Sequence, residues 1–361
     1  MARGDAAERD SAFGFGGTWR EYAPIAFTNL LLTIVTLGIY SFWARARTRR
    51  YLWSRTRFID DRLEWTGTGL ELFLGYLLAI VLFFVPLGII QFVLQGVVLR
   101  GHPGAAILGA AILYIGLLYL VGVAIFRALR YRLSRTFWHG IRGGSDEQGF
   151  GYAGQYLWRT LVGTLALGLM IPWSMTTLWN RRWNAMSFGP LRFQAQADWR
   201  NVFGRFLLFY LWPIVLFIGL GAIGVMGLTA GGATPTGGGG VAIVLLGLLF
   251  VSIFYGLLGV IALAFYAAYF REGVGTLTLG GLQFGFTART KDFILLFLGN
   301  VALVLVTLGI GYIFVPYRNW AFFIRHLEAY GEVVLEELTQ STTREPGQGE
   351  GLLDAFDVGA F

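Results

Sequence analysis

The sequence predicts an all-α polytopic membrane protein with internal pseudo-repeats, in which transmembrane helix pairs alternate with Gly/Pro-broken (re-entrant) helices and small cytoplasmic β-hairpins. Hydrophobic residues form 56% of the 361-residue chain and charged residues only 14%, which is too little charge to cover the surface of a soluble protein of this length. A unit of membrane length also recurs. N-L-L-L-T-I-V-T-L-G-I, starting at Asn29, returns as N-V-A-L-V-L-V-T-L-G-I from Asn300, and more weakly around Gly168.

Seven apolar stretches are long enough to cross about 30 Å of hydrocarbon, and they fall into three predicted repeats. The first repeat (1–149) holds a broken helix at 23–44, a hairpin at 56–67, and transmembrane helices at 70–99 and 104–126. The second (150–283) holds a broken helix at 160–180, hairpins at 186–196 and 276–287, and transmembrane helices at 203–228 and 241–269. A partial third (284–340) holds a broken helix at 293–317 and an amphipathic helix at 319–339. A polar linker and an apolar–acidic tail occupy 341–361.

The charge between these stretches predicts the topology. Arginine-rich segments follow the first, third, fourth, sixth and seventh stretches, whereas 100–104 and 229–240 carry little or no charge. The positive-inside rule places the arginine-rich segments and the C-terminus in the cytoplasm. The stretches 23–44, 160–180 and 293–317 must then start and end on the same side. We therefore interpret them as helix–break–helix segments buried in protein; seven ordinary crossings remain the alternative.

The segments on the cytoplasmic side show the pattern of β-hairpins. R-F-I-D-D-R-L-E-W, M-S-F-G-P-L-R-F and L-T-L-G-G-L-Q-F each alternate around a two-residue turn signal, which is typical of short antiparallel strand pairs. Similar Phe-Gly segments begin near Phe13, Phe150 and Phe284, so the period is about 135 residues. A period of that length indicates an old duplication and not a solenoid.

These residues resemble a known family. The run T-L-G-I-Y-S-F-W-A-R-A-R-T-R-R-Y, the preceding F-G-F-G-G-T with Asn29, and the following L-E-W-T-G-T are similar to the YjgN-like inner-membrane proteins, a family defined by a domain of unknown function. The copy near 284–320, the hairpin at 188–193 and the C-terminal tail extend the resemblance over nearly the whole chain. At the middle break, Thr-Leu-Gly-Ile is replaced by L-G-L-M from Leu167. The resemblance implies a bacterial inner-membrane location with several spans, and it implies no activity and no catalytic residues.

The sequence offers no constellation for catalysis. The chain has no cysteine, which excludes disulfides, thiolate catalysis and cysteine-bound metal. Its three histidines, His102, His139 and His326, lie in separate connections without metal-ligand spacing. The glycine-rich runs lack the Lys-Ser/Thr context of a phosphate loop. We expect no enzyme activity, no cofactor and no metal.

The broken segments are the candidate site. Interrupted helices at corresponding repeat positions point to a binding site, because unwound carbonyls and half-helix ends can meet a ligand. The residues involved are Asn29, Gly38, Gly168, Pro172, Asn300, Gly309 and Gly311. Two interpretations stay open. In one these residues line a pathway; in the other the two asparagines are structural pins that tie the broken helices together. Charged residues are absent from the span interiors, which disfavours proton-coupled transport.

Partners follow from charge and from the tail. Of 28 basic residues only Lys291 is lysine, and arginines beside apolar runs indicate anionic lipid headgroups and not nucleic acid. The expected headgroup or interface anchors are Trp43, Arg45, Arg47, Arg49, Arg50, Trp53, Arg181 and Arg182. A short docking peptide for a protein partner is predicted at Leu352, Leu353, Phe356, Val358 and Phe361, with an unselected terminus as the alternative.

The function predicted from these features is a non-enzymatic bacterial inner-membrane scaffold or partner-regulating subunit, expected to be a homo-oligomer. A channel or uncoupled transporter with its path at the broken helices is the second reading.

Overall fold

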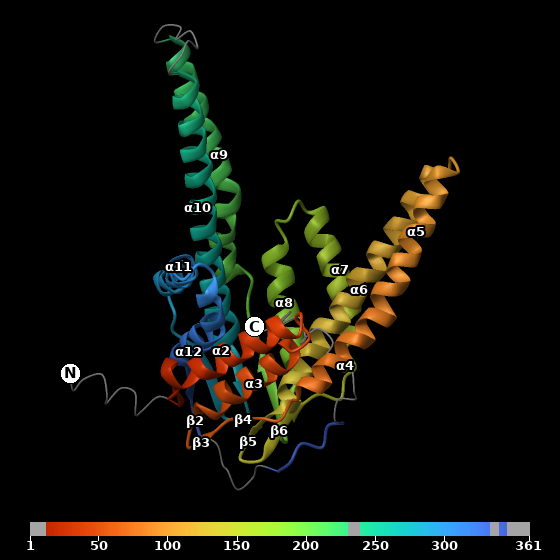
Figure 1. Ribbon diagram of the computed structural model, residues 1–361, viewed down its shortest axis with the longest axis vertical. Coiled ribbons are helices and arrows are strands. Elements are labelled where there is room, and N and C mark those ends of the chain that lie inside the picture. The colour runs from red at the N-terminus through yellow and green to blue at the C-terminus, as the bar shows by residue number, and fades with distance from the viewer. Residues whose placement is uncertain (1–11, 230–238, 333–338, 345–361) are drawn as a thin grey trace, which may run out of the picture.

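The computed structural model describes residues 12–229, 239–332 and 339–344. The chain is mostly helical, and its helices form five antiparallel pairs that stand on a layer of short strands (Figure 1). Each pair leaves this strand layer and returns to it, so both ends of every pair lie on the same side of the molecule. This arrangement makes the predicted cytoplasmic strand pairs the common base of the protein.

Three of the pairs are the predicted broken segments. They are α2 (Trp19–Val35) with α3 (Ser41–Ser54), α7 (Phe150–Leu165) with α8 (Ile171–Asn184), and α11 (Thr290–Val306) with the 3-10 turn η2 (Ile310–Phe314) and α12 (Val315–His326). We call them the first, second and third hairpins. Each begins at a capping or turn residue close to a strand. Thr18, for example, accepts a hydrogen bond from the Glu21 amide and so caps α2.

The other two pairs are longer. One consists of α4 (Gly69–Ala79), a five-residue π-helical stretch η1 (Ile80–Phe84) and α5 (Val85–Leu99), paired with α6 (Pro103–Arg135). The other consists of α9 (Arg200–Thr229) and α10 (Gly239–Gly275). Figure 1 shows these two pairs rising from the same end of the molecule and diverging.

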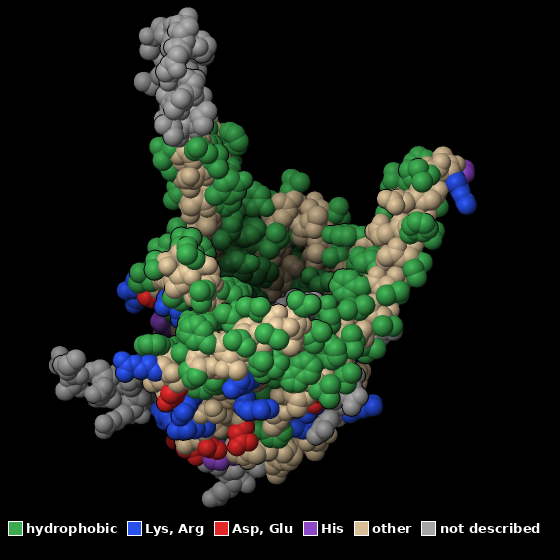
Figure 2. Space-filling view, in the orientation of Figure 1, with side chains coloured by type: hydrophobic (Ala, Val, Ile, Leu, Met, Phe, Trp, Pro, Cys, Tyr) green, Lys and Arg blue, Asp and Glu red, His purple; other side chains and the backbone are tan. Residues whose placement is uncertain are grey.

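Within the described residues, three helical segments are long and apolar enough to cross a membrane. They are Pro103–Arg135, Arg200–Ile218 and Gly247–Gly275. Few of their residues are buried inside the protein: 6% of the most apolar window of Gly247–Gly275, for instance. Figure 2 shows apolar side chains covering the long pairs, while arginine and acidic side chains gather around the strand layer. Helices of this kind imply contact with a lipid bilayer.

The strands form one sheet of eight and one of three. The eight-stranded sheet has the order β11-β10-β9-β8-β7-β6-β5-β4, and the smaller sheet has the order β1-β2-β3, with all neighbours antiparallel. The strands are β1 (Phe13–Phe15), β2 (Thr56–Phe58), β3 (Asp61–Arg62), β4 (Glu64–Trp65), β5 (Thr136–Trp138), β6 (Ile141–Gly144), β7 (Ser187–Phe188), β8 (Leu191–Ala195), β9 (Leu277–Leu279), β10 (Leu282–Phe286) and β11 (Leu327–Tyr330).

The sheet curls around a shared apolar core. Phe58, Trp138, Phe193 and Phe284 come from four different strands and are all buried in one cluster with residues from the bases of α6, α8 and α10. The three-stranded sheet contributes to the same region, since the rings of Phe13 on β1 and Phe284 on β10 lie 6.3 Å apart. The helix pairs are thus held together at their bases by the curled sheet.

Two sequence expectations need correction, and the first is the all-α class, because the structure contains an eight-stranded and a three-stranded sheet beside its helices. The hairpins predicted near 56–67, 186–196 and 276–287 form, but the structure joins them, with the unpredicted β5 and β6, into continuous sheets. The helix predicted over 319–339 ends at His326, and Leu327–Tyr330 is a strand paired with β10. Leu327–Tyr330 forms a strand because its backbone hydrogen-bonds to β10. The helical spacing of apolar residues in the sequence gave no sign of this pairing.

Two turns at the base lie against each other. The β2–β3 turn carries Asp60 and the β5–β6 turn carries His139, whose Nε2 lies 2.9 Å from Asp60 Oδ1. This hydrogen bond is the main cause of a lowered pKa for the Asp60 carboxyl, because it favours the ionised form. The contact joins the three-stranded sheet to the eight-stranded one through their turns.

Candidate functional site: the helical hairpins and the cavity between two of them

The three helical hairpins turn with the same backbone. Leu37, Leu167 and Leu308 have φ values of 50°, 53° and 51°, and each is followed by a glycine with φ of 93°, 83° and 95°. In the first hairpin the Gly38 amide donates to Thr33 O at 2.8 Å and the Leu37 amide to Ile34 O at 3.1 Å. The same two bonds recur in the other hairpins. This pattern is the Schellman helix ending, which satisfies carbonyls that the last helical turn leaves open.

The residue in the left-handed position is unusual. Glycine is favoured there because a Cβ atom clashes with the backbone, so each leucine costs on the order of 1 kcal/mol. These leucines gain no packing in return, since Leu37, Leu167 and Leu308 are 94%, 82% and 93% exposed. An exposed apolar side chain on a strained backbone suggests that its environment is not water. The tips are therefore suited to contact with lipid.

Asn29 and Asn300 tie the two arms of their hairpins together. Asn29 Nδ2 donates to Ala44 O at 3.2 Å and to Thr48 Oγ1 at 3.4 Å, both on α3. Asn300 Nδ2 donates to Asn319 Oδ1 on α12 at 2.9 Å, and its Oδ1 accepts from Arg318 Nε at 2.7 Å. Thr48 and Asn319 lie at the same distance in sequence from the two asparagines. Each asparagine thus bonds from one arm of its own hairpin to the other arm.

The second hairpin uses a different side chain at the same place. Arg159 stands nine residues before Gly168, and its guanidinium lies 5.5 Å from the centre of the Trp173 ring on α8. Cation–π contact with the opposite arm takes the place of the asparagine hydrogen bonds. Arg159 also donates to Gln155 Oε1 within its own helix at 2.5 Å.

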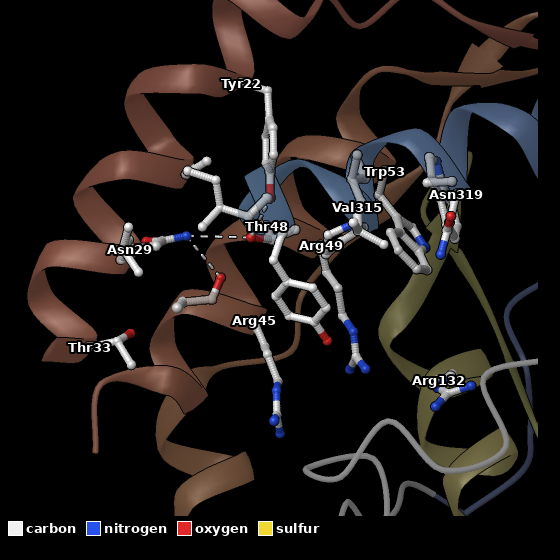
Figure 3. A pocket seen from close by; sticks show the side chains of 18 residues that line it. Tyr22, Asn29, Thr33, Arg45, Thr48, Arg49, Trp53, Arg132, Val315 and Asn319 are labelled. Atoms are coloured by element: carbon white, nitrogen blue, oxygen red, sulfur yellow. Dashed lines mark hydrogen bonds between the residues drawn. The ribbon is translucent and has the colours of Figure 1, made fainter. Parts of the chain in front are cut away.

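A cavity of about 480 Å³ lies between the first and third hairpins. Their contact is built from aromatic rings: Tyr22 stacks on Tyr317 with centroids 5.4 Å apart, and Trp53 stacks on Trp320 at 4.0 Å. Tyr22 also donates from its hydroxyl to Ile313 O at 3.3 Å. Figure 3 shows the side chains that line the space left between these contacts, and they come from α2, α3, α6, η2 and α12.

Three arginines line the cavity wall. Arg45 and Arg49 on α3 and Arg132 on α6 all line it, and no aspartate or glutamate stands among the described lining residues. Arg49 is only 8% exposed and lies 5.2 Å from the centre of the Trp65 ring. Arg45 and Arg132 are half-buried.

Most of the residues predicted to line a pathway lie apart from one another in the structure. Asn29 lines the cavity, whereas Asn300 ties its own hairpin and does not line it. Gly38 and Gly309 lie at exposed tips, with no atom within 4 Å of the place a Cβ would take. The other predicted residues are dispersed as well: Gly168 faces the Tyr210 hydroxyl, Pro172 is fully buried in α8, and Gly311 is buried in η2.

The predicted headgroup anchors also separate into groups. Arg47 and Arg50 are exposed on α3, as an anchor must be. Trp53 and Arg182 are buried, and Arg181 is 2.9 Å from Glu147 in an ion pair, so these three act within the protein. The remaining anchors are placed as follows: Trp43 is half-buried against Phe73, Arg45 lines the cavity, and Arg49 is buried beside Trp65.

The sequence did not reveal that the segment before the tail is fixed. Residues 339–344 were predicted to belong to a helix end and a polar linker, but Ser341 and Thr343 are buried. Arg142 on β6 donates to Thr343 O, and Arg130 on α6 donates to Arg344 O at 3.2 Å. Arg130 is 0% exposed. The predicted docking residues from Leu352 to Phe361 lie outside the described residues.

Comparison with known proteins finds relatives that are inner-membrane proteins of bacteria. Inner membrane protein YjgN of Salmonella typhimurium LT2 is 30% identical over 130 residues, and its counterpart in Escherichia coli O157:H7 is 31% identical over 131 residues. Each match covers 36% of this chain and 30% of the length of the relative. No solved structure matches the chain.

The family match is far longer than these pairwise matches. A family described as bacterial protein of unknown function (DUF898) matches residues 10–355, which include all five helix pairs and every strand described above. The chain therefore belongs to the DUF898 family, whose relatives named above are inner-membrane proteins.

Proposed function

We propose that this protein is a non-enzymatic scaffold or partner-regulating subunit of the bacterial inner membrane. The observation that carries the proposal is the fixed exit of the C-terminal tail. Arg142 and Arg130 hold the backbone of Thr343 and Arg344 against the base of the molecule. The tail that follows therefore starts from a defined point beside the strand layer. A short apolar peptide presented from a rigid base is suited to binding a protein partner.

The proposal includes a membrane topology. The three hairpins enter the bilayer from the cytoplasmic side and return to it, and the two longer pairs cross it. The helices of the hairpins, at 14–17 residues in the first two, are shorter than the roughly 20 residues that a crossing needs. The identical Leu-Gly turns also support an internal repeat with units near 1–149, 150–283 and 284–340.

The cysteine-free chain provides a direct test of this topology. Single cysteines at Arg20, Leu37 and Arg47 place a label before, at and after the first turn. Re-entry predicts that Arg20→Cys and Arg47→Cys react with a charged maleimide only from the cytoplasmic side, while Leu37→Cys is protected. An ordinary crossing would place the first two on opposite sides. Single cysteines at Arg100 and Arg127 on the longer pair are the positive control for a crossing.

The scaffold itself is tested by intact-mass measurements in native nanodiscs, with and without residues 346–361. We expect a protein partner on the full chain that is lost on truncation, and an unchanged thermal transition of the membrane body. A full-length variant in which 346–361 is replaced by Gly/Ser repeats controls for length. A homo-oligomer with the same composition in all three preparations would contradict the scaffold proposal.

The channel or transporter reading has less support. It needs the broken-helix residues to surround one path, and among the described residues Asn29 and Asn300 each bond within their own hairpin. We therefore expect Asn29→Leu to lower the stability of the first hairpin by about 1–3 kcal/mol through its lost hydrogen bonds, without changing ion flux across proteoliposomes. A change of flux in a fully folded variant would favour the channel.

A further inference from the structure

We propose that His139 is a pH-sensitive clasp for the exit of the C-terminal tail, closed when its imidazole is protonated and loosened when the imidazole is neutral. The inference rests on the scaffold proposal, because it assigns a regulation to the tail through which that proposal binds a partner. It is carried by the contacts of the β5–β6 turn, formed by His139 and Gly140, with the β2–β3 turn and with the segment 339–344. The strands of these turns lie at the base of the molecule (Figure 1).

Both nitrogens of the His139 ring face carboxylates of the β2–β3 turn. Nε2 lies 2.9 Å from Asp60 Oδ1, and Nδ1 lies 3.8 Å from Asp61 Oδ2. A neutral imidazole carries a hydrogen on only one of its nitrogens, so the other nitrogen would present a lone pair to a carboxylate. A protonated imidazole has a hydrogen on both nitrogens and a positive charge. The arrangement therefore fits the protonated ring better than the neutral one.

The imidazole contacts two carboxylates and one aromatic ring. Within the described residues, its hydrogen-bond, ion-pair and ring contacts are those to Asp60, Asp61 and Trp138. Four other charged residues stand on the strands that meet here, and none of them makes such a contact with the imidazole: Arg57, Arg62, Glu64 and Arg142. The His139 side chain is 35% exposed, so its protonation can follow the pH of the surrounding solvent.

Each of the two turns holds one residue in a left-handed backbone conformation. Ile59 has a φ of 56° and His139 a φ of 50°, and each is the first central residue of a two-residue turn. A positive φ is rare for a β-branched residue such as isoleucine. Strained residues of this kind are concentrated at functional sites and switch regions. The strain at this contact therefore supports a role for it beyond joining two strands.

The same β5–β6 turn also holds the segment from which the tail leaves the molecule. Gln340 Nε2 donates to Gly140 O at 2.8 Å, and Gln340 Oε1 accepts from the Arg142 amide at 3.2 Å. Because Gly140 directly follows His139 in the turn, a shift of the imidazole away from the β2–β3 turn moves a carbonyl that anchors 339–344. Loss of the imidazolium contact therefore loosens the start of the tail.

The pH range of the clasp is the range in which histidine titrates, between about pH 5 and pH 8. The hydrogen bond with His139 is the main cause of the lowered pKa of the Asp60 carboxyl, so this carboxylate stays ionised throughout that range. The imidazolium–carboxylate pair is therefore complete at the acidic end of the range. It is lost as the pH rises and the imidazole gives up its proton, so the tail is loosened at the alkaline end.

The test measures the mobility of a spin label at Thr342→Cys, an exposed position of the docked segment, in full-length protein in nanodiscs across this pH range. The measurement needs no partner, so its failure is distinct from a failure of the scaffold proposal. His139→Asn is the probe variant, because asparagine adopts left-handed turn conformations and does not titrate. Asp60→Asn removes the facing carboxylate. His102→Asn is the matched control, since His102 precedes α6 at the opposite end of that helix from β5.

We expect the mobile population of the label to rise about two- to fivefold from the acidic to the alkaline end in the parent, as for one half-exposed ion pair, and equally in His102→Asn. His139→Asn should lose this response, and Asp60→Asn should lose most of it. A parent that does not respond to pH, or an unchanged response in His139→Asn, would overturn the clasp. An unchanged response in Asp60→Asn would overturn Asp60 as the partner of the imidazole. Thermal unfolding of each variant verifies that the strand layer remains folded.

Discussion

At the scale of single residues, the backbone of the hairpin tips is in conflict with the local conformational preference of leucine. Leu37, Leu167 and Leu308 occupy a left-handed position that glycine would fill at lower energetic cost, and in each hairpin a glycine stands at the next position. The usual rules for helix ends would place glycine at the position that the leucine occupies. The sequence T-L-G-I correctly located the break between the two helices of the hairpin. It could not show that the leucine, and not only the glycine, takes a left-handed backbone conformation.

Replacing Leu37 by glycine and by alanine separates backbone strain from the loss of the side chain. Both variants remove the exposed leucine, but only glycine relieves the left-handed conformation. We expect Leu37→Gly to be more stable than Leu37→Ala by about 1 kcal/mol, measured by thermal unfolding in detergent. Equal stability of the two variants would mean that this turn carries no strain. In bilayers, both should bind lipid at the tip less well than the parent.

At the scale of elements, close approach between helices depends on particular glycines. A Cβ on Gly122 of α6 would lie 2.8 Å from the Ala153 Cα of α7, whereas a Cβ on Gly116 of the same helix meets nothing within 4 Å. The second hairpin is thus placed against α6 by the absence of one side chain. Small residues serve this purpose in membrane helices, because backbones can then pack directly.

The two glycines form a matched pair for measurement. Gly122→Ala must push α7 away from α6, so we expect it to destabilise the protein by about 1–3 kcal/mol. Gly116→Ala makes no clash and removes a flexible residue from a helix, so it should be neutral or stabilising by up to about 1 kcal/mol. Chemical unfolding in detergent gives both values. A smaller effect at Gly122 than at Gly116 would contradict the packing described for α6 and α7.

At the scale of the whole molecule, the curled sheet decides where every helix pair begins and ends. Because the strands of both sheets lie at one end of the molecule, each of the five pairs returns to the end from which it left. The same base also receives the far end of the chain, through the bonds that Arg142 and Arg130 make to 343–344.

The docking of this end segment can be disrupted from the sheet. A Cβ on Gly144 would collide with the Thr343 side chain. We expect Gly144→Ala to release 339–344, which a spin label at an introduced Gln340→Cys would report as a gain in mobility. Gly140→Ala is not a suitable control because of its positive φ of 71°; Gly154→Ala, which has open space and an ordinary helical backbone, is the appropriate one. An unchanged spectrum in Gly144→Ala would contradict tight docking at this glycine.

The membrane class, the long apolar helices, the three breaks and the turn residues of three strand pairs could be predicted from the sequence, because these depend on composition and on local periodicity. Other features follow from long-range contacts. Pairing partners for L-E-A-Y at 327–330, and the burial of Trp53, Arg130 and Arg182, depend on segments far away in the chain. The cavity has the same origin. Its wall combines residues of the first hairpin with Arg132 on α6 and with Ile313 and Asn319 of the third hairpin, and no local pattern in the sequence encodes proximity across so many residues.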